Sequence, residues 1–161
     1  MIADLTSAHV WEVIEQQNFG VLGMVTTKHE ARTTGIVYIL GGRRLYIGTW
    51  TSMWQVRHVQ QNPHVSVTIP IHKRVPFMPW IQVPAATITF SAEADVIAAL
   101  DAPRELLEKL YHVVASDEQK MARYSLIEVT PRGEFLTYGI GMSVLDMRDP
   151  QKARRRVPVD V

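Results

Sequence analysis

Apolar and polar residues alternate with a period of two along several segments of the chain, the pattern of β-strands with one buried face. The longest is 86–96, where apolar residues occupy every second position and Thr, Ser, Glu or Asp lie between them. Segment 64–70 shows the same alternation. Segment 19–26 is apolar at almost every position, which predicts a strand covered on both sides.

Turn signals separate further predicted strands. Gly41-Gly42 lies between 32–40 and 44–49 and is typical of a two-residue hairpin turn. A second hairpin is predicted for 124–138, with its turn at Pro131-Arg132-Gly133. Both connections are short, so they indicate neighbouring antiparallel strands.

Three segments change to the period of an amphipathic helix. They are 7–17, 51–61 and 101–114. In the second, Ser52 with Gln55 three residues later forms a capping-box sequence. In the third, Asp101 is the expected cap and Pro103 is expected in the first turn.

The order of these elements predicts a mainly β protein of the α+β class. Its six to seven antiparallel strands close into a small barrel with flanking helices. The chain lacks the βαβ alternation that a doubly wound sheet requires. Residues 1–161 are interpreted as one domain, with a basic C-terminal tail at about 149–161 that is expected to lie in solvent.

Composition limits the classes of function. The formal net charge of +1 gives no general attraction to nucleic acids or anionic membranes, so neither is expected as a partner. The absence of cysteine excludes disulfides, thiolate catalysis and iron–sulfur clusters, and it fits a cytoplasmic protein. No apolar segment is long and uninterrupted enough to predict a signal peptide or a membrane span.

No catalytic residue can be assigned from motifs. The six histidines form no helical pair and no cluster, so no metal site is expected. Glu93 and Asp95 share one strand face and are interpreted as solvated rather than as an acid–base pair. Gly139 and Gly141 lack the third glycine and the helix of a dinucleotide-binding turn.

The segment 49–63 is the most informative one for function. A strand leads through three hydroxyl residues, Thr49, Thr51 and Ser52, into a helix N-terminus, whose free N–H groups attract anions. An ordinary capped helix explains the same sequence. Four tryptophans are either core and dimer contacts or a wall that stacks on a flat ligand.

Three stretches resemble the pyridoxamine 5′-phosphate oxidase-like, FMN-binding split β-barrel superfamily. They are FGVLGMVT (19–26), RTTGIVYILGGRRLYIGT (32–49) and QQNPHVSVTI (60–69). The resemblance implies a homodimeric antiparallel split β-barrel that binds FMN, or a deazaflavin, at the subunit interface. It also implies oxidation or reduction of a small molecule that the sequence does not identify.

Carried over by position, the resemblance implies a set of cofactor-lining residues. They are Thr33, Thr34, Gly35, Gly48, Thr49 and Ser52. Trp54 and Gln55 stand where family members usually carry a basic pair that binds the phosphate. Arg32 is the expected replacement cation, with Lys73 and Arg74 of a second subunit's 71–84 connection as the remaining candidates. Because this exchange weakens phosphate binding, the alternative is a non-catalytic or sensor-like barrel that binds another flat ligand or no cofactor.

The segment 71–84 is predicted to be a long connection over the ligand pocket or the dimer seam. It carries Phe77, Met78 and Trp80 among three prolines, a combination that a loop seldom exposes without a partner. A second subunit is also the simplest cover for the strands predicted at 19–26 and 32–40.

Overall fold

The computed structural model describes residues 5–75, 77–78, 80–81, 83–111 and 117–160. In this part of the chain eight antiparallel strands form one sheet. Their bounds are β1 (Phe19–Val25), β2 (Ala31–Val37), β3 (Ile39–Gly41), β4 (Arg44–Trp50), β5 (His64–Ile71), β6 (Ala86–Ala98), β7 (Tyr124–Tyr138) and β8 (Arg154–Pro158). The fold class predicted from the sequence is therefore confirmed.

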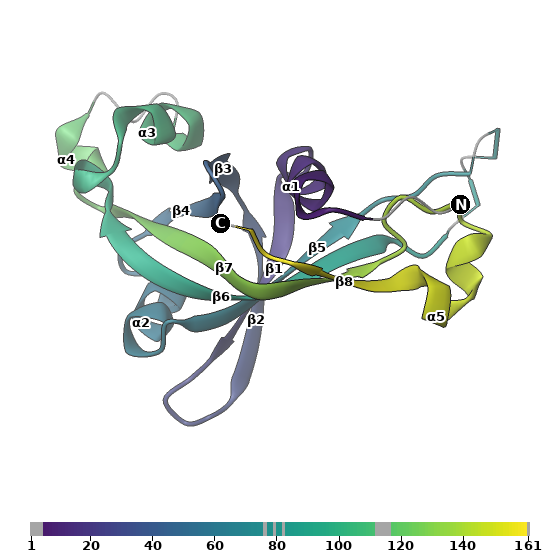
Figure 1. Cartoon of the computed structure of the whole chain (residues 1–161). Helices are drawn as coiled ribbons and strands as arrows, with labels where there is room; N and C mark the ends of the chain where they lie inside the picture. Colours follow the sequence, from purple (N-terminus) through teal and green to yellow (C-terminus); the bar gives the residue numbers. More distant parts are fainter. Residues whose placement is uncertain (1–4, 76, 79, 82, 112–116, 161) are drawn as a thin grey trace.

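The strand order is β2-β1-β5-β6-β7-β4-β3, and β8 pairs with β7 outside this path. Strands β2 and β3 are the two ends of the order, yet only Tyr38 separates them in the chain. The sheet therefore curls round on itself, as Figure 1 shows. The side chains that face inward form one apolar core cluster.

Tyr38 divides the strand expected at 32–40 into β2 and β3. Its side chain is almost completely buried, and its hydroxyl donates to the carbonyl of Ile14 at 2.8 Å. Its backbone N–H donates to Asn18 O at 3.0 Å. The expectation of one continuous strand is wrong because the residues before Tyr38 pair with β1, whereas the residues after it pair with β4.

Five α-helices lie around the sheet in the described residues. They are α1 (Ser7–Glu15), α2 (Trp54–Gln61), α3 (Arg104–Tyr111), α4 (Glu118–Met121) and α5 (Pro150–Ala153), with 3-10 turns η1 (Ala99–Asp101) and η2 (Asp146–Arg148). Thr6 caps α1 by accepting the N–H of His9. Trp11 of this helix packs edge-to-face on Phe135, with ring centroids 5.3 Å apart, so α1 is part of the core.

Helix α2 starts at Trp54, three residues later than predicted, and the capping box is wrong. Met53 is the N-cap, and no side chain caps the helix. Thr51 is instead held at the start of β7, because its N–H donates to O of Arg123, the residue before β7, at 2.9 Å and its hydroxyl lies 2.9 Å from that of Ser125. These bonds extend the preceding segment, so Ser52 cannot take the N-cap position.

Helix α3 begins at Arg104, three residues later than the predicted start at 101. Asp101 belongs to the turn η1, and Arg104 is the first helical residue, so Asp101 is not its cap. Positions 112–114 lie outside the described residues. The helix packs Leu106 and Leu107 into a second apolar cluster, which contains Tyr46 of β4.

The hairpin predicted in 124–138 is wrong, because β7 is one strand of 15 residues. Its turn sequence forms a bulge: Thr89 pairs with Leu136, but Ser91 pairs with Arg132. Gly133 supplies the positive φ of 73° that this extra length requires. A Pro-Arg-Gly sequence fits a bulge as well as it fits a turn.

The basic C-terminal segment is not a solvated tail. Residues 154–158 form β8, in register with 134–138 of β7. Trp11 and Arg43 both donate to the carbonyl oxygen of Asp160, which fixes the strand's end to the body of the protein. The sequence pattern did not predict this strand because three consecutive arginines show no alternation of polar and apolar residues.

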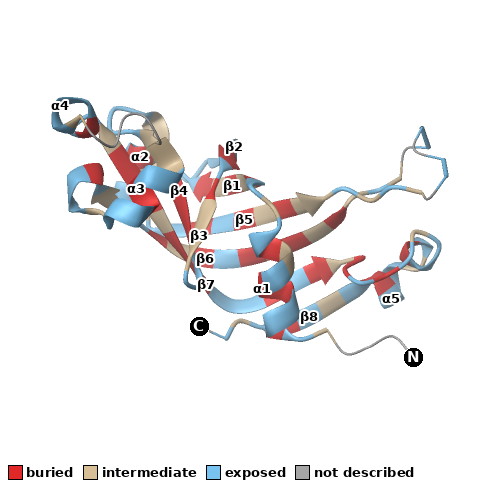
Figure 2. Cartoon of the chain, turned by 90° about the horizontal axis from the view of Figure 1, so that it is seen from above, coloured by how far each residue is buried: buried red, intermediate tan, exposed pale blue. Residues whose placement is uncertain are grey.

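Within one chain, β1 is covered on one side only. The cover on its other side, expected for 19–26 from a second subunit, stays a prediction. Leu22 and Met24 are buried in the core, whereas Phe19 and Val25 face outward and are exposed. On the neighbouring β2, Val37 is 64% exposed. The burial colours in Figure 2 show the contrast between buried and exposed positions along the strands.

Candidate functional site

The candidate site is a slit between β2 and β4, two strands that contact each other without sharing hydrogen bonds. The slit holds a cavity of about 260 Å³. Its lining comes from β1, β2, β4, α2 and β7: Leu22, Gly35, Ile36, Val37, Ile47, Gly48, Thr49, Gln55 and Ile127. Four of the nine sequence-predicted site residues, Gly35, Gly48, Thr49 and Gln55, are thus brought together.

The slit combines apolar walls with one unsatisfied acceptor. Gly35 and Gly48 line it on its two sides, while Ile47 and Ile127 supply apolar surface. The Oε1 atom of Gln55 is buried and has no hydrogen-bond partner among the described residues. A buried carbonyl without a donor is costly, so this geometry favours a ligand with an apolar face and an N–H or O–H group.

Tyr111 of α3 determines the geometry of the β4 wall. Its hydroxyl accepts the N–H of Thr49 at 3.1 Å and donates to Ser125 O at 3.1 Å. A Cβ atom on Gly48 would lie 2.8 Å from the Tyr111 hydroxyl, so only glycine fits there. Burial raises the pKa of Tyr111 to about 12, which keeps the phenol protonated.

Sequence reasoning missed Tyr111 because it lies 62 positions from Thr49 in the chain. The Tyr111 hydroxyl also explains why position 48 is a glycine, without any contribution from a cofactor. The only local signal was an aromatic residue in the predicted helix 101–114, which does not indicate a contact with β4.

The four tryptophans do not form a wall of the slit. Trp50 stacks on Tyr124 with ring centroids 4.4 Å apart, and Trp11 lies in the core. Trp54 contacts His58 edge-on at 5.5 Å, and Trp80 lies in the exposed connection between β5 and β6. None of the four lines the slit.

Two other predicted residues, Arg32 and Trp54, meet in a second cavity of about 370 Å³ beside α2. His58 and Lys28 also line it. Arg32 donates to Glu30 at 3.2 Å, and both side chains are largely exposed. Arg32, the side chain expected to bind the phosphate, therefore lies near the first turn of α2 but outside the slit.

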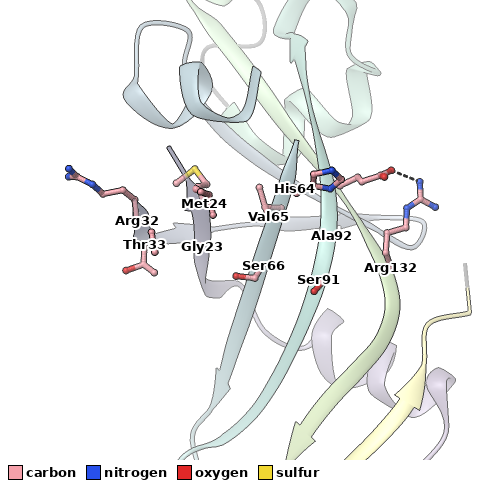
Figure 3. A pocket seen from close by; sticks show the side chains of 13 residues that line it. Gly23, Met24, Arg32, Thr33, His64, Val65, Ser66, Ser91, Ala92 and Arg132 are labelled. Carbon is pink, nitrogen blue, oxygen red and sulfur yellow. Dashed lines mark hydrogen bonds and ion pairs between the residues drawn. The ribbon is translucent and has the colours of Figure 1, made fainter. Parts of the chain in front are cut away.

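The remaining predicted residues do not line the slit. Thr33 borders a third cavity, of about 550 Å³, on the outer face of the sheet. Figure 3 shows its central hydroxyls, Ser66 and Ser91, and the dashed line marks the ion pair of Arg132 with Glu93 at 2.9 Å. The Thr34 hydroxyl lies 3.4 Å from Gly35 O, and Ser52 is exposed in the turn before α2.

The described residues contain no group of three His, Asp or Glu side chains that could bind a metal ion. Glu93, interpreted above as solvated, pairs with Arg132 at the surface. The same part of the chain has no helix that is long and apolar enough to cross a membrane.

No known family and no curated protein matches the sequence. Solved structures do match the fold. A putative pyridoxamine 5′-phosphate oxidase from Listeria innocua is 17% identical, with a TM-score of 0.57 over 78% of this chain and 92% of that one. A FAD-binding protein from Mesorhizobium loti is 14% identical, with a TM-score of 0.57 over 79% and 88%.

The heme storage protein HutZ from Vibrio cholerae is 11% identical, with a TM-score of 0.61 over 84% of this chain and 96% of that one. The chain therefore has the split β-barrel fold of the pyridoxamine 5′-phosphate oxidase-like proteins, as the resemblance implied. Proteins that share this fold are described as binding either flavin or heme.

Proposed function

We propose that the slit between β2 and β4 binds the ring system of a flavin, FMN or a deazaflavin, and that the protein is a flavin-dependent oxidoreductase acting on a small molecule. The observation that carries the proposal is the apolar slit that Gln55 lines, together with the Oε1 atom of this side chain, which is buried without a hydrogen-bond partner among the described residues. A flavin ring is flat, largely apolar on its faces, and carries an N–H donor on its edge. It matches both features of the cavity.

The size of the slit limits how much of a flavin it encloses. Its volume of about 260 Å³ is below the roughly 300–1,000 Å³ of typical ligand pockets. The ring would therefore enter only in part, with its ribityl phosphate toward α2 and the cavity that Arg32 lines. When bound, the flavin supplies the redox chemistry, and Gln55, Thr49 and the two glycines orient its ring.

A homodimer is part of the proposal, because one chain has more surface than a compact monomer of its mass. A globular monomer of 18.3 kDa exposes about 8,100 Å², whereas this chain exposes 10195 Å². Burying the surplus of about 2,000 Å² would give an interface within the range of obligate homodimers. The exposed Phe19 and Val37 on the outer face of the sheet fit such an interface.

The second candidate is a non-catalytic barrel that holds another flat ligand, such as a heme, or none. Trp54 and Gln55, at the positions where the resemblance implies a basic pair, favour it, as does the pairing of Arg32 with Glu30. A charge-assisted hydrogen bond contributes about 1.5–3 kcal/mol. Its loss weakens phosphate binding by roughly tenfold or more.

The two candidates are separated by titration of the purified protein with FMN, a deazaflavin and hemin. We expect quenching of flavin fluorescence with a saturable, one-to-one stoichiometry per chain. Saturable binding of hemin alone, or of none of the three ligands, would favour the second candidate and reject the flavin proposal.

A further inference from the structure

The described residues between β5 and β6, namely 72–75, 77–78, 80–81 and 83–85, are called the arm below and extend beyond the end of the sheet. Figure 2 shows that this segment projects away from the body of the protein. The side chains of Phe77 and Trp80 are 95% and 75% exposed. Met78 and Ile81 are exposed as well, so the arm presents four large apolar side chains to solvent.

The described residues of the arm have a defined shape. Met78 N–H donates to Val75 O at 3.2 Å, and Ile81 N–H donates to Met78 O at 3.1 Å. Phe77 adopts a φ of 64°, a left-handed conformation that bulky residues rarely take. At the base, Lys73 donates from Nζ to Met142 O at 3.0 Å. Successive turns and an anchored base present the apolar side chains in a defined arrangement.

The arm does not cover the slit of its own chain. In Figure 1 the arm and α2, which borders the slit, lie at opposite ends of the molecule. The expectation that 71–84 lies over the ligand pocket therefore fails within one chain. Its apolar side chains remain exposed in a single chain.

We propose that the arm packs on a second copy of this chain, with Phe77 and Trp80 as its anchors. The inference rests on the homodimer proposed above and specifies how that dimer is held together. In a two-fold dimer each arm contacts the partner in the same way, so both exposed tips are covered at once. Such an exchange would bury part of the surplus surface of about 2,000 Å².

A lipid surface is the competing partner, because Lys73 and Arg74 flank the aromatic tip. Lys73 already bonds to the body of the chain, however, which leaves Arg74 as the exposed cation at the arm's base. One cation attracts an anionic membrane only weakly. The exposed Phe19 and Val37 on β1 and β2 further favour a second copy, because a membrane contact at the arm's tip would leave both uncovered.

The first test replaces both anchors, Phe77→Ser with Trp80→Ser, and measures self-association by sedimentation equilibrium. We expect the dimer dissociation constant to rise at least 100-fold, because buried aromatic side chains dominate the energy of most interfaces. Leu100→Ser, at an exposed apolar residue of η1 outside the arm, is the matched control and should leave the constant unchanged. An unchanged dimer in the double variant, with native circular dichroism, would overturn the proposal.

The second test uses the absence of cysteine in the chain. A benzophenone attached at Ile81→Cys should photo-cross-link two chains of 18.3 kDa each. The same label at Leu100→Cys should not. Cross-links confined to one chain would overturn the proposal, as would a monomeric protein whose arm binds phosphatidylserine vesicles. Each test measures the association of two chains and does not depend on flavin binding. A wild-type dimer that binds no flavin would therefore reject the proposed function and leave this inference intact.

Discussion

The side chain of Gln55 is expected to favour ligand binding and to lower the stability of the ligand-free protein. Its Oε1 atom is buried without a partner, which costs the ligand-free protein about 1–3 kcal/mol. We therefore expect Gln55→Leu to raise the free energy of unfolding by about 1 kcal/mol while weakening flavin binding tenfold or more. Urea denaturation and fluorescence titration measure the two effects. The exposed Gln60→Leu in the same helix should change neither.

Arg32 and Arg57 give a paired test of where the phosphate lies. Arg32 lines the cavity beside Trp54, whereas Arg57 is exposed on α2 and lines neither the slit nor that cavity. We expect Arg32→Ala to weaken FMN binding roughly tenfold, with no effect on riboflavin, which has no phosphate. Arg57→Ala should change neither ligand. Equal losses for FMN and riboflavin in Arg32→Ala would place the phosphate elsewhere.

Tyr111 makes the stability of the protein depend on alkaline pH. Burial raises its pKa to about 12, above the value of 10.0 for an exposed tyrosine. The unfolded chain therefore loses the phenolic proton first, so the stability contributed by Tyr111 is present below pH 10 and is lost as the pH rises toward 12. Burial raises the pKa of Tyr38 as well, so it contributes in the same direction.

The variant Tyr111→Phe isolates this contribution. It removes the acceptor for Thr49 N–H and should lower the free energy of unfolding by about 1–3 kcal/mol at neutral pH. Its stability should also fall less steeply between pH 10 and 12 than that of the wild type. Parallel curves for the two proteins would contradict the assignment. Urea unfolding at each pH supplies the measurement.

At the scale of elements, alternation predicted strands wherever polar residues marked one face. Strand β6 was recognisable because its outward positions are Thr, Ser, Glu and Asp. Strand β8 was not, because Arg154, Arg155 and Arg156 occupy both faces and its pairing with β7 depends on the fold. Strand β7 was divided in error because a turn sequence and a bulge use the same residues.

Gly133 tests the bulge in β7. Its φ of 73° disfavours side chains, yet no atom lies within 4 Å of the place a Cβ would take. The expected cost of Gly133→Ala is therefore conformational alone, about 1–2 kcal/mol, measured by urea denaturation. Asparagine tolerates this conformation better than alanine, so Gly133→Asn should cost less. An equal loss of stability in both variants would contradict the assignment of the cost to the positive φ at position 133.

The slit was predictable from the sequence only in part. Gly35, Gly48, Thr49 and Gln55 come from three elements that the sequence pattern identified, and the resemblance brought them to one site. Arg32 lies outside the slit for two reasons: the residue at which α2 begins, and the ion pair between Arg32 and Glu30. Both depend on tertiary contacts, such as that of Thr51 with Ser125, which periodicity does not encode.

At the scale of the whole molecule, the surplus surface and the arm predict that folding is coupled to association. If burial in a dimer stabilises the native state, the midpoint of thermal unfolding must rise with protein concentration. We expect an increase of several degrees over a hundredfold range of concentration, because a 1 kcal/mol change shifts the midpoint of a chain of this size by roughly 2–4 °C. The variant with both Phe77→Ser and Trp80→Ser should unfold at a temperature independent of concentration, with Leu100→Ser behaving as the wild type. Differential scanning fluorimetry over that range is the measurement, and a midpoint independent of concentration in the wild type would contradict the coupling.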